Sequence, residues 1–171
     1  QRVIAQLRRA GYQVDPMEDW TSDTDEPRRF SLDRLDGCQA CVLLVGFCRG
    51  FVPAGQERSI TQMEYDHAPG RKIDFLPFLL DDEVTGWPDQ YDDRTTDPQL
   101  NAWREYIGLH HGVERFTADP TSVDVLPALL RWQARQYERE QVRDYLASIR
   151  ATHGVIRFLG LPTQHDHQDM R

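Results

Sequence analysis

The hydroxyl of Thr61 and the carboxylate of Glu64 lie three residues apart in the segment RSITQMEYDHA, residues 58–68. Ser59 and Gln62 have the spacing of a capping box, in which each side chain satisfies a backbone amide at the start of a helix. This spacing predicts a helix that begins directly after Ser59. Thr61 and Glu64 then share one face of its first turns, where the helix dipole favours an ionised carboxylate.

A fixed, ionised carboxylate beside a small-molecule cleft suits the cleavage of an N-glycosidic bond. That reaction passes through a sugar cation of oxocarbenium character, which an anion can stabilise or trap covalently. The alternative is that Glu64 belongs to the acidic residues that are common in first helical turns because the dipole favours them. On the pattern alone, this structural interpretation of Glu64 is the favoured one.

The elements around this helix alternate between helices and strands. Apolar periodicity and capping signals predict helices over residues 1–10, 27–37, 59–68 and 98–111, and a further helix that follows a cap at Asp119 or Thr121 and runs past Trp132. Strands are predicted over residues 12–17, 41–47, 73–80 and 113–117. Alternation of this kind implies parallel strands with right-handed crossovers, so the predicted fold class is an α/β open, doubly wound parallel sheet.

Particular residues refine these elements. The run CVLLVGF, residues 41–47, is apolar almost without alternation, which predicts a strand covered on both faces. Pro77 predicts an edge position, a bulge or an early end for the strand over residues 73–80. Pro69 and Gly70 predict that the Glu64 helix ends after two or three turns. The acidic residues 81–97 predict a long surface loop.

The domain organisation follows from where the pattern changes. We predict one α/β domain over residues 1–135 and a helical linker over residues 136–171 that leads toward a downstream domain. A domain of this type normally opens with a strand, whereas this sequence opens inside a predicted helix. We therefore expect the sequence to be a fragment that lacks the first strand of its sheet.

Composition excludes several classes of protein. The chain has 171 residues, a formal net charge of −8 and a pI of about 5.2, so it lacks the basic footprint of a nucleic-acid-binding protein. No signal peptide is visible, and no run approaches the roughly 18 consecutive apolar residues of a membrane span, so we expect neither. Three clustered cysteines indicate reduced thiols in a cytoplasmic protein. Cys38-x-x-Cys41 has no second ligand pair, so we expect no metal ion there and no required cofactor.

Three segments carry a resemblance to a known family: SITQMEYDHA at residues 59–68, VDPMEDW at residues 14–20 and CQACVLLVGFCRGF at residues 38–51. Together they resemble the domain of unknown function found ahead of NACHT-type and related STAND ATPases, which is described as similar to TIR domains and nucleoside 2-deoxyribosyltransferases. The resemblance covers roughly residues 1–132 and implies a flavodoxin/TIR-like sheet. No Walker A motif is present, so the ATPase would be a downstream domain of the same chain.

The resemblance also implies roles for individual residues. In TIR domains and deoxyribosyltransferases the essential glutamate lies in the helix after the third strand, three residues after a small or polar position. Thr61 and Glu64 match this spacing, which implies that Glu64 is the catalytic residue. The other implied ligand-binding residues border the same cleft: Ser59, Thr61, Arg49, Gly50, Glu18 and Trp20.

Three hypotheses about function remain open at this point. The first is an N-terminal effector or signalling module of a STAND-type protein in prokaryotic antiviral defence, a hydrolase of NAD or a related nucleotide that self-associates under control of the ATPase domain. The second is a non-catalytic homotypic or inter-domain interaction module, in which a buried Glu64 would pair with Arg49 or Arg58. The third is a nucleotide sensor without turnover.

Overall fold

The computed structural model describes residues 1–16, 27–119 and 121–153. The chain forms two compact units, Gln1–Arg131 and Trp132–Arg171, of which the second is described as far as His153. Five helices are assigned in the described residues: α1 (Arg2–Arg9), α2 (Pro27–Leu35), α3 (Ile60–Arg71), α4 (Pro98–His110) and α5 (Leu126–His153). None of these helices combines the length and apolar character needed to cross a bilayer.

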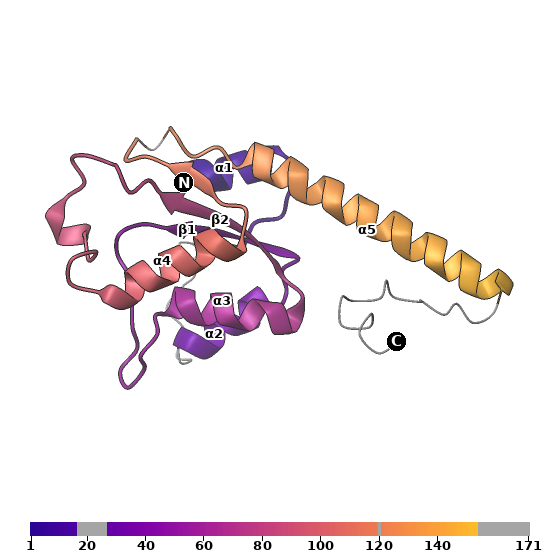
Figure 1. Ribbon diagram of the computed structural model, residues 1–171, viewed down its shortest axis with the longest axis horizontal. Helices are drawn as coiled ribbons and strands as arrows, with labels where there is room; N and C mark the ends of the chain where they lie inside the picture. Colours follow the sequence, from indigo (N-terminus) through magenta and orange to yellow (C-terminus); the bar gives the residue numbers. More distant parts are fainter. Residues whose placement is uncertain (17–26, 120, 154–171) are drawn as a thin grey trace, which may run out of the picture. The chain divides into compact units, whose positions relative to one another are not determined.

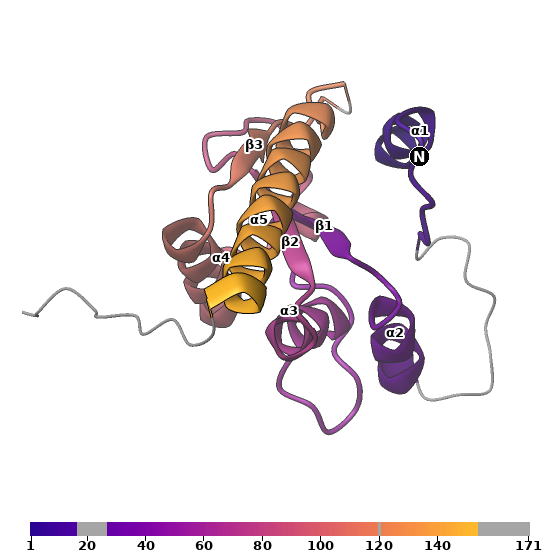
Figure 2. The same cartoon turned by 90° about the vertical axis from the view of Figure 1, so that its right-hand side faces the viewer.

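The described sheet has three parallel strands in the order β1-β2-β3 (Figures 1 and 2). They are β1 (Ala40–Val45), β2 (Asp74–Leu80) and β3 (Glu114–Phe116). Figure 2 shows α1 on one side of this sheet and α2 with α3 on the other. Parallel strands joined through helices, with helices on both sides, confirm the predicted open, doubly wound α/β class.

The outer edge of β1 differs from the prediction. Tyr12–Pro16 forms no strand, and no described strand pairs with β1 on the side away from β2. A strand is stable only when it has a hydrogen-bonded neighbour, which local sequence does not reveal. The expected coverage of β1 on both faces is also wrong. Leu43 and Val45 are buried against α3 and α4, but Leu44, which points to the opposite face, is 45% exposed.

The core that supports α3 consists of two adjoining clusters. The first joins the sheet to α3 and α4 and contains Leu43, Val45, Tyr65, Leu79 and Ile107. The second contains Leu35, Ala68 and Ile73, with Cys38 and Cys41 packed against it. Because α2 contributes Leu35 and α3 contributes Ala68, the second cluster fixes these two helices against each other.

The start of α3 is as predicted and its end is not. The Ser59 Oγ accepts from the Gln62 amide at 3.3 Å, and the Ser59 amide donates to Gln62 Oε1 at 3.0 Å, which completes the capping box. The helix continues through Pro69 to Arg71, because a proline in the last turn removes only one amide bond. It ends where Lys72 adopts a left-handed conformation with φ 60°.

We expect Lys72→Gly to raise the free energy of unfolding by about 0.5–1 kcal/mol. A left-handed backbone is strained for any residue with a Cβ, and glycine relieves this strain, although it also increases the entropy of the unfolded chain. Chemical denaturation of the protein would measure the change. Lys72→Ala is the matched control, because it removes the same side chain and keeps the strain; an equal gain in both variants would contradict the prediction.

Pro77 lies in the central strand of the described sheet, which corrects its expected edge position. β3 pairs with β2 only from Phe78 onward, while β1 pairs with β2 from Asp74 to Leu79. At Pro77 the strand therefore has one paired neighbour, which limits the cost of the missing amide hydrogen.

The boundaries of the last two helices also depart from the predictions. The side chain of Asp124 accepts from the Leu126 amide at 3.1 Å at the start of α5, whereas Asp119 accepts from the Thr121 amide within a preceding turn. The cap predicted at Asp119 or Thr121 is therefore wrong. The apolar spacing in α4 predicts that Leu100, Trp103, Tyr106 and Ile107 face inward, but Tyr106 is exposed and Arg104 is buried. Residues 81–97 form the predicted surface loop, with one 3-10 turn over Asp89–Tyr91.

Candidate functional site

Glu64 lies on the buried side of α3, one turn after Thr61. Its side chain is 9% exposed, and the hydroxyl of Ser31 on α2, itself 2% exposed, donates to Glu64 Oε1. Neither of the arginines considered from the sequence pairs with it. Arg49 Nε lies 2.9 Å from Asp97 Oδ2, and Arg58 pairs with Asp66. Glu64 is therefore a buried carboxyl whose described hydrogen-bond donor is a neutral hydroxyl.

Burial raises the pKa of Glu64 above its ordinary value, and the hydrogen bond from Ser31 opposes this shift. The thiol of Cys41 on β1 is the neighbouring titratable group. Its pKa is raised to about 12, first by burial and then by the negative charges of Glu64 and Cys38. Cys41 is thus a neutral thiol at physiological pH, which makes it unreactive as a nucleophile. Among the described side chains, no cluster has the ligands of a metal site.

An open cleft of about 610 Å³ lies between the loop after β1 and the start of α4. Arg49 and Gly50 line one wall, and Asp93 and Asp97 lie on the other. Arg49 bridges the two walls, because its amide donates to Asp93 Oδ2 at 3.4 Å and its guanidinium pairs with Asp97. The cleft therefore contains a cation whose charge is already balanced by the protein.

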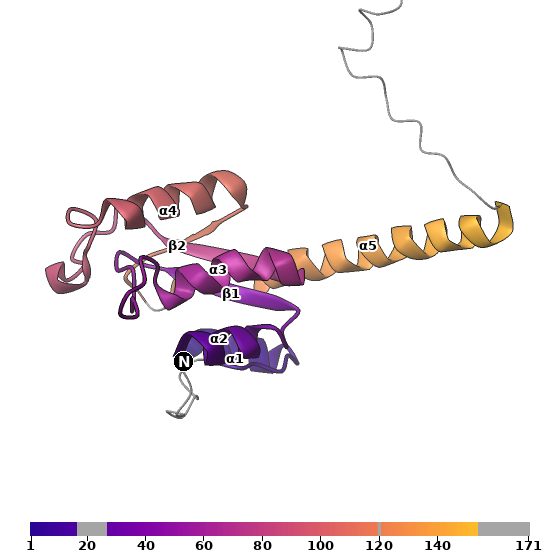
Figure 3. The ribbon, with the colours of Figure 1, turned by 90° about the horizontal axis from the view of Figure 1, so that it is seen from below.

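Gly50 connects the cleft to α3. Its φ of +83° is a conformation that favours glycine, and a Cβ placed there would lie 3.9 Å from Thr61 Oγ1. Thr61 therefore lies directly behind the backbone of the cleft wall, and Glu64 follows one turn deeper in the same helix. Figure 3 shows α2 beside β1 and α4 beyond β2. The hydrogen bond from Ser31 to Glu64 therefore links α3 to the helix beside β1.

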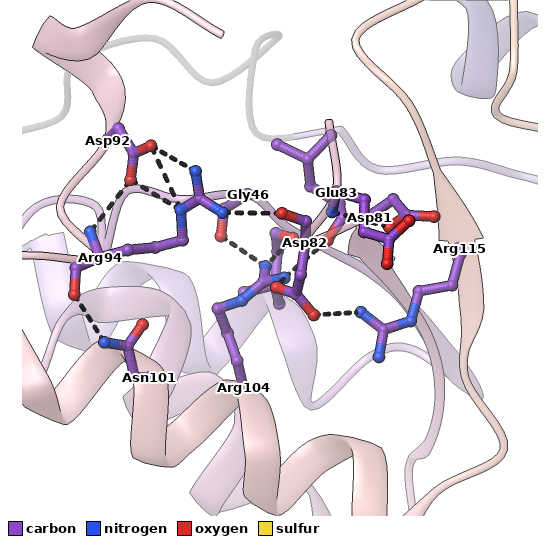
Figure 4. A network of polar contacts seen from close by, with 11 residues as sticks. Gly46, Asp81, Asp82, Glu83, Asp92, Arg94, Asn101, Arg104 and Arg115 are labelled. Carbon is purple, nitrogen blue, oxygen red and sulfur yellow. Dashed lines mark hydrogen bonds and ion pairs between the residues drawn. The ribbon is translucent and has the colours of Figure 1, made fainter. Parts of the chain in front are cut away.

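The carboxyl edge between β1 and β2 is filled by the protein itself (Figure 4). The guanidinium of Arg104, 5% exposed, donates to the carbonyl oxygens of Val45 and Gly46 at 3.0 and 2.8 Å. It also donates to the Leu80 carbonyl at 2.6 Å and to Asp82 Oδ1 at 2.7 Å. Open α/β sheets bind ligands where the strand order reverses. The three described strands follow chain order, so no such reversal lies between them.

The family model described as "Domain of unknown function (DUF4062)" matches residues 1–147, which is most of the chain. The chain belongs to the DUF4062 family. No curated protein and no solved structure matches it. The DUF4062 match includes α5 as far as Ala147, so the family extends beyond the sheet and its covering helices.

The residues singled out from the sequence have separate places in this DUF4062 domain. Arg49 and Gly50 line the cleft, Thr61 lies behind Gly50, and Glu64 is enclosed between α3 and α2. Ser59 is fully buried and its hydroxyl is used by the capping box, so that hydroxyl does not face the cleft. Two further candidates, Glu18 and Trp20, lie outside the described residues.

Ser31 and Cys41 are the neighbours of Glu64 that sequence reasoning missed. One signal for Ser31 was available, since it lies four residues before Leu35 and therefore shares a helix face with a core residue. A serine on the buried face of an amphipathic helix requires a polar partner. Local patterns could not identify Glu64 as this partner, because the contact joins residues of two different helices that lie 33 positions apart in the chain.

Proposed function

We propose that this DUF4062 domain is the N-terminal effector or signalling module of a STAND-type, NACHT-like cytoplasmic protein in prokaryotic antiviral defence. Its reaction is the hydrolysis of the N-glycosidic bond between nicotinamide and ribose in NAD or a related nucleotide. The observation that carries this proposal is the Glu64 carboxyl in the first turns of α3, buried and held by the Ser31 hydroxyl, with its pKa raised by burial. Carboxyls with shifted pKa values are concentrated at functional sites.

The proposed step uses Glu64 as an ionised carboxylate. The bond between ribose C1′ and the pyridinium nitrogen breaks, and its electron pair leaves with nicotinamide, which becomes neutral. The ribosyl cation that remains is stabilised by the carboxylate, and water then adds at C1′ and releases a proton to solvent. Nicotinamide is already an adequate leaving group, so no acid is needed to protonate it.

The cleft lined by Arg49 and Gly50 supports this proposal. Its volume of about 610 Å³ lies in the range of roughly 300–1,000 Å³ that is usual for small-molecule sites. A nucleotide phosphate would compete with Asp97 for the Arg49 guanidinium, which is suited to bidentate phosphate recognition. Thr61, behind Gly50, connects this cleft to the turn of α3 that carries Glu64.

The test is nicotinamide release from NAD by the full-length protein. We expect Glu64→Gln, which keeps the size of the side chain and removes its charge, to lower kcat by about 100- to 1,000-fold. Asp66→Asn is the matched control, because Asp66 lies on the same helix, exposed and paired with Arg58, and its loss should leave the rate unchanged. Equal rates for wild type and Glu64→Gln, or no release by the assembled wild-type protein, would refute the proposal.

A second candidate function is suggested by α5. Residues 132–150 of this helix contain no buried side chain, and Tyr137, Val142 and Tyr145 are exposed. Helices of this length obtain most of their stability from packing of an apolar face. The observation favours a non-catalytic interaction module whose partner is the downstream ATPase domain or another copy in an oligomer. Saturable nucleotide binding without product would instead favour a sensor.

A further inference from the structure

Ser31 is placed in the contact between α2 and α3. Leu35 of α2 and Ala68 of α3 pack in the same cluster, and Asp36 at the end of α2 pairs with His67 and Arg71 of α3 at 2.6 and 3.1 Å. These contacts fix the two helices without help from Ser31. A small apolar residue would fill the same space, so packing does not explain why a hydroxyl is buried there.

The hydrogen bond explains the hydroxyl. Ser31 is 2% exposed, which excludes bulk water as its partner, and the acceptor that it finds is Glu64 Oε1. Among the described residues, Ser31 is the one side chain that donates to this carboxyl. An ionised carboxylate is purely an acceptor, so a fixed donor selects both its charge state and its orientation.

We propose that Ser31 is the positioning residue of the Glu64 site: its hydroxyl holds Oε1 and fixes the rotation of the carboxyl group, so that the carboxylate used in the proposed reaction keeps one orientation. This inference rests on the proposed function for its catalytic meaning. The contact itself is independent of that function. Ser31 does not touch the substrate and acts through Glu64.

The charged and titratable surroundings agree with this role. Cys41 faces Glu64 from β1, and with a pKa of about 12 it remains neutral and provides no counter-charge. Asp36 contacts His67 and Arg71, which lie three and seven residues after Glu64 on α3, and neither of these side chains donates to Glu64. Burial alone would favour the protonated form of Glu64, and the Ser31 hydrogen bond shifts the balance back toward the carboxylate that the proposed reaction requires.

The experiment compares full-length wild type with Ser31→Ala, Ser31→Thr and Ser31→Cys. Two properties are measured against pH: nicotinamide release from NAD, and the carboxyl C=O band of Glu64 in pH-difference infrared spectra, assigned by its absence in Glu64→Gln. Ser122→Ala is the matched control, since it removes the hydroxyl of a serine that is hydrogen-bonded in the turn before α5 and does not contact Glu64.

We expect Ser31→Ala to move the Glu64 titration midpoint to higher pH, because the ionised form loses its donor. The low-pH side of the kcat–pH profile should move to higher pH by the same amount. In that pH range kcat should be about tenfold lower than in wild type, and KM should be nearly unchanged. Ser31→Thr should restore both properties, and Ser31→Cys, which keeps the volume and weakens the donor, should shift them in the same direction as alanine. Ser122→Ala should leave the midpoint unchanged.

An unmoved midpoint in folded Ser31→Ala and Ser31→Cys would overturn the positioning role, as would a uniform loss of rate at every pH. A midpoint that moves in protein without any nicotinamide release would support the positioning of Glu64 by Ser31 and refute the cleavage reaction. Nicotinamide release that persists in Glu64→Gln would refute the catalytic role of Glu64 and, with it, any catalytic effect of Ser31.

Discussion

Replacing Arg104 with methionine should lower the free energy of unfolding by about 3–5 kcal/mol. The guanidinium donates to three backbone carbonyls at the ends of β1 and β2, those of Val45, Gly46 and Leu80. Methionine fills much of the space and donates nothing, so these buried acceptors lose their partner. The ion pair with Asp82 contributes little to the loss, because that carboxylate is 59% exposed.

Thermal or denaturant unfolding of the full-length protein, followed through the transition of this domain, would measure the effect. Arg115→Met is the matched control, since Arg115 also pairs with Asp82, at 3.0 Å, but is 46% exposed. It should cost less than about 1 kcal/mol. Similar losses in the two variants would mean that Arg104 acts through its ion pair and that its bonds to the strand ends are unimportant.

Arg104 also illustrates a limit of prediction from sequence. The periodicity of Leu100, Trp103, Tyr106 and Ile107 correctly predicted a helix there, and Leu100 and Ile107 are fully buried. The same periodicity predicts Tyr106 inward and does not predict a buried Arg104, because an arginine on the inner face of a helix contradicts the usual pattern. What reverses the expectation is a set of carbonyl acceptors on two strands, 24 to 59 residues away in the chain.

The same distinction between local and distant contacts applies to the candidate site. The capping box and the helical spacing of Thr61 and Glu64 depend on neighbouring residues, and both were predictable. The donor to Glu64 was not, because the contact between Ser31 and Glu64 depends on how α2 and α3 pack. The strand predicted over residues 12–17 is wrong in its described part, Tyr12–Pro16, for a related reason, since its formation requires a partner on an adjacent strand.

The network around Arg104 has a consequence for where a ligand can bind. Phe47, which follows β1, is fully buried, and the guanidinium carbons of Arg94 and Arg104 lie 3.6 and 4.9 Å from its ring centroid. The carboxyl edge between β1 and β2 is therefore occupied by stacked side chains. The proposed reaction is thus expected beside Gly50 and α2, away from this closed edge.

Phe47→Ala should destabilise the domain by about 3–5 kcal/mol, the usual cost of removing a buried aromatic ring. The ring loses its edge-to-face contact with Trp87, at a centroid distance of 5.8 Å, and the two guanidinium groups lose the surface on which they stack. Phe47→Leu is the matched control, because it keeps most of the apolar volume and should cost about 1–1.5 kcal/mol. The measurement is the same unfolding transition as for Arg104→Met.

The double variant Phe47→Ala/Arg104→Met tests whether the ring and the guanidinium act as one unit. Arg104 is held in place partly by its stacking on Phe47, so once the ring is gone its bonds to the strand carbonyls are weakened already. We therefore expect the double variant to lose about 1–2 kcal/mol less than the sum of the two single variants. Strict additivity would show that the ring and the carbonyl bonds stabilise the strand ends independently, and the closed edge would then consist of two separate contacts.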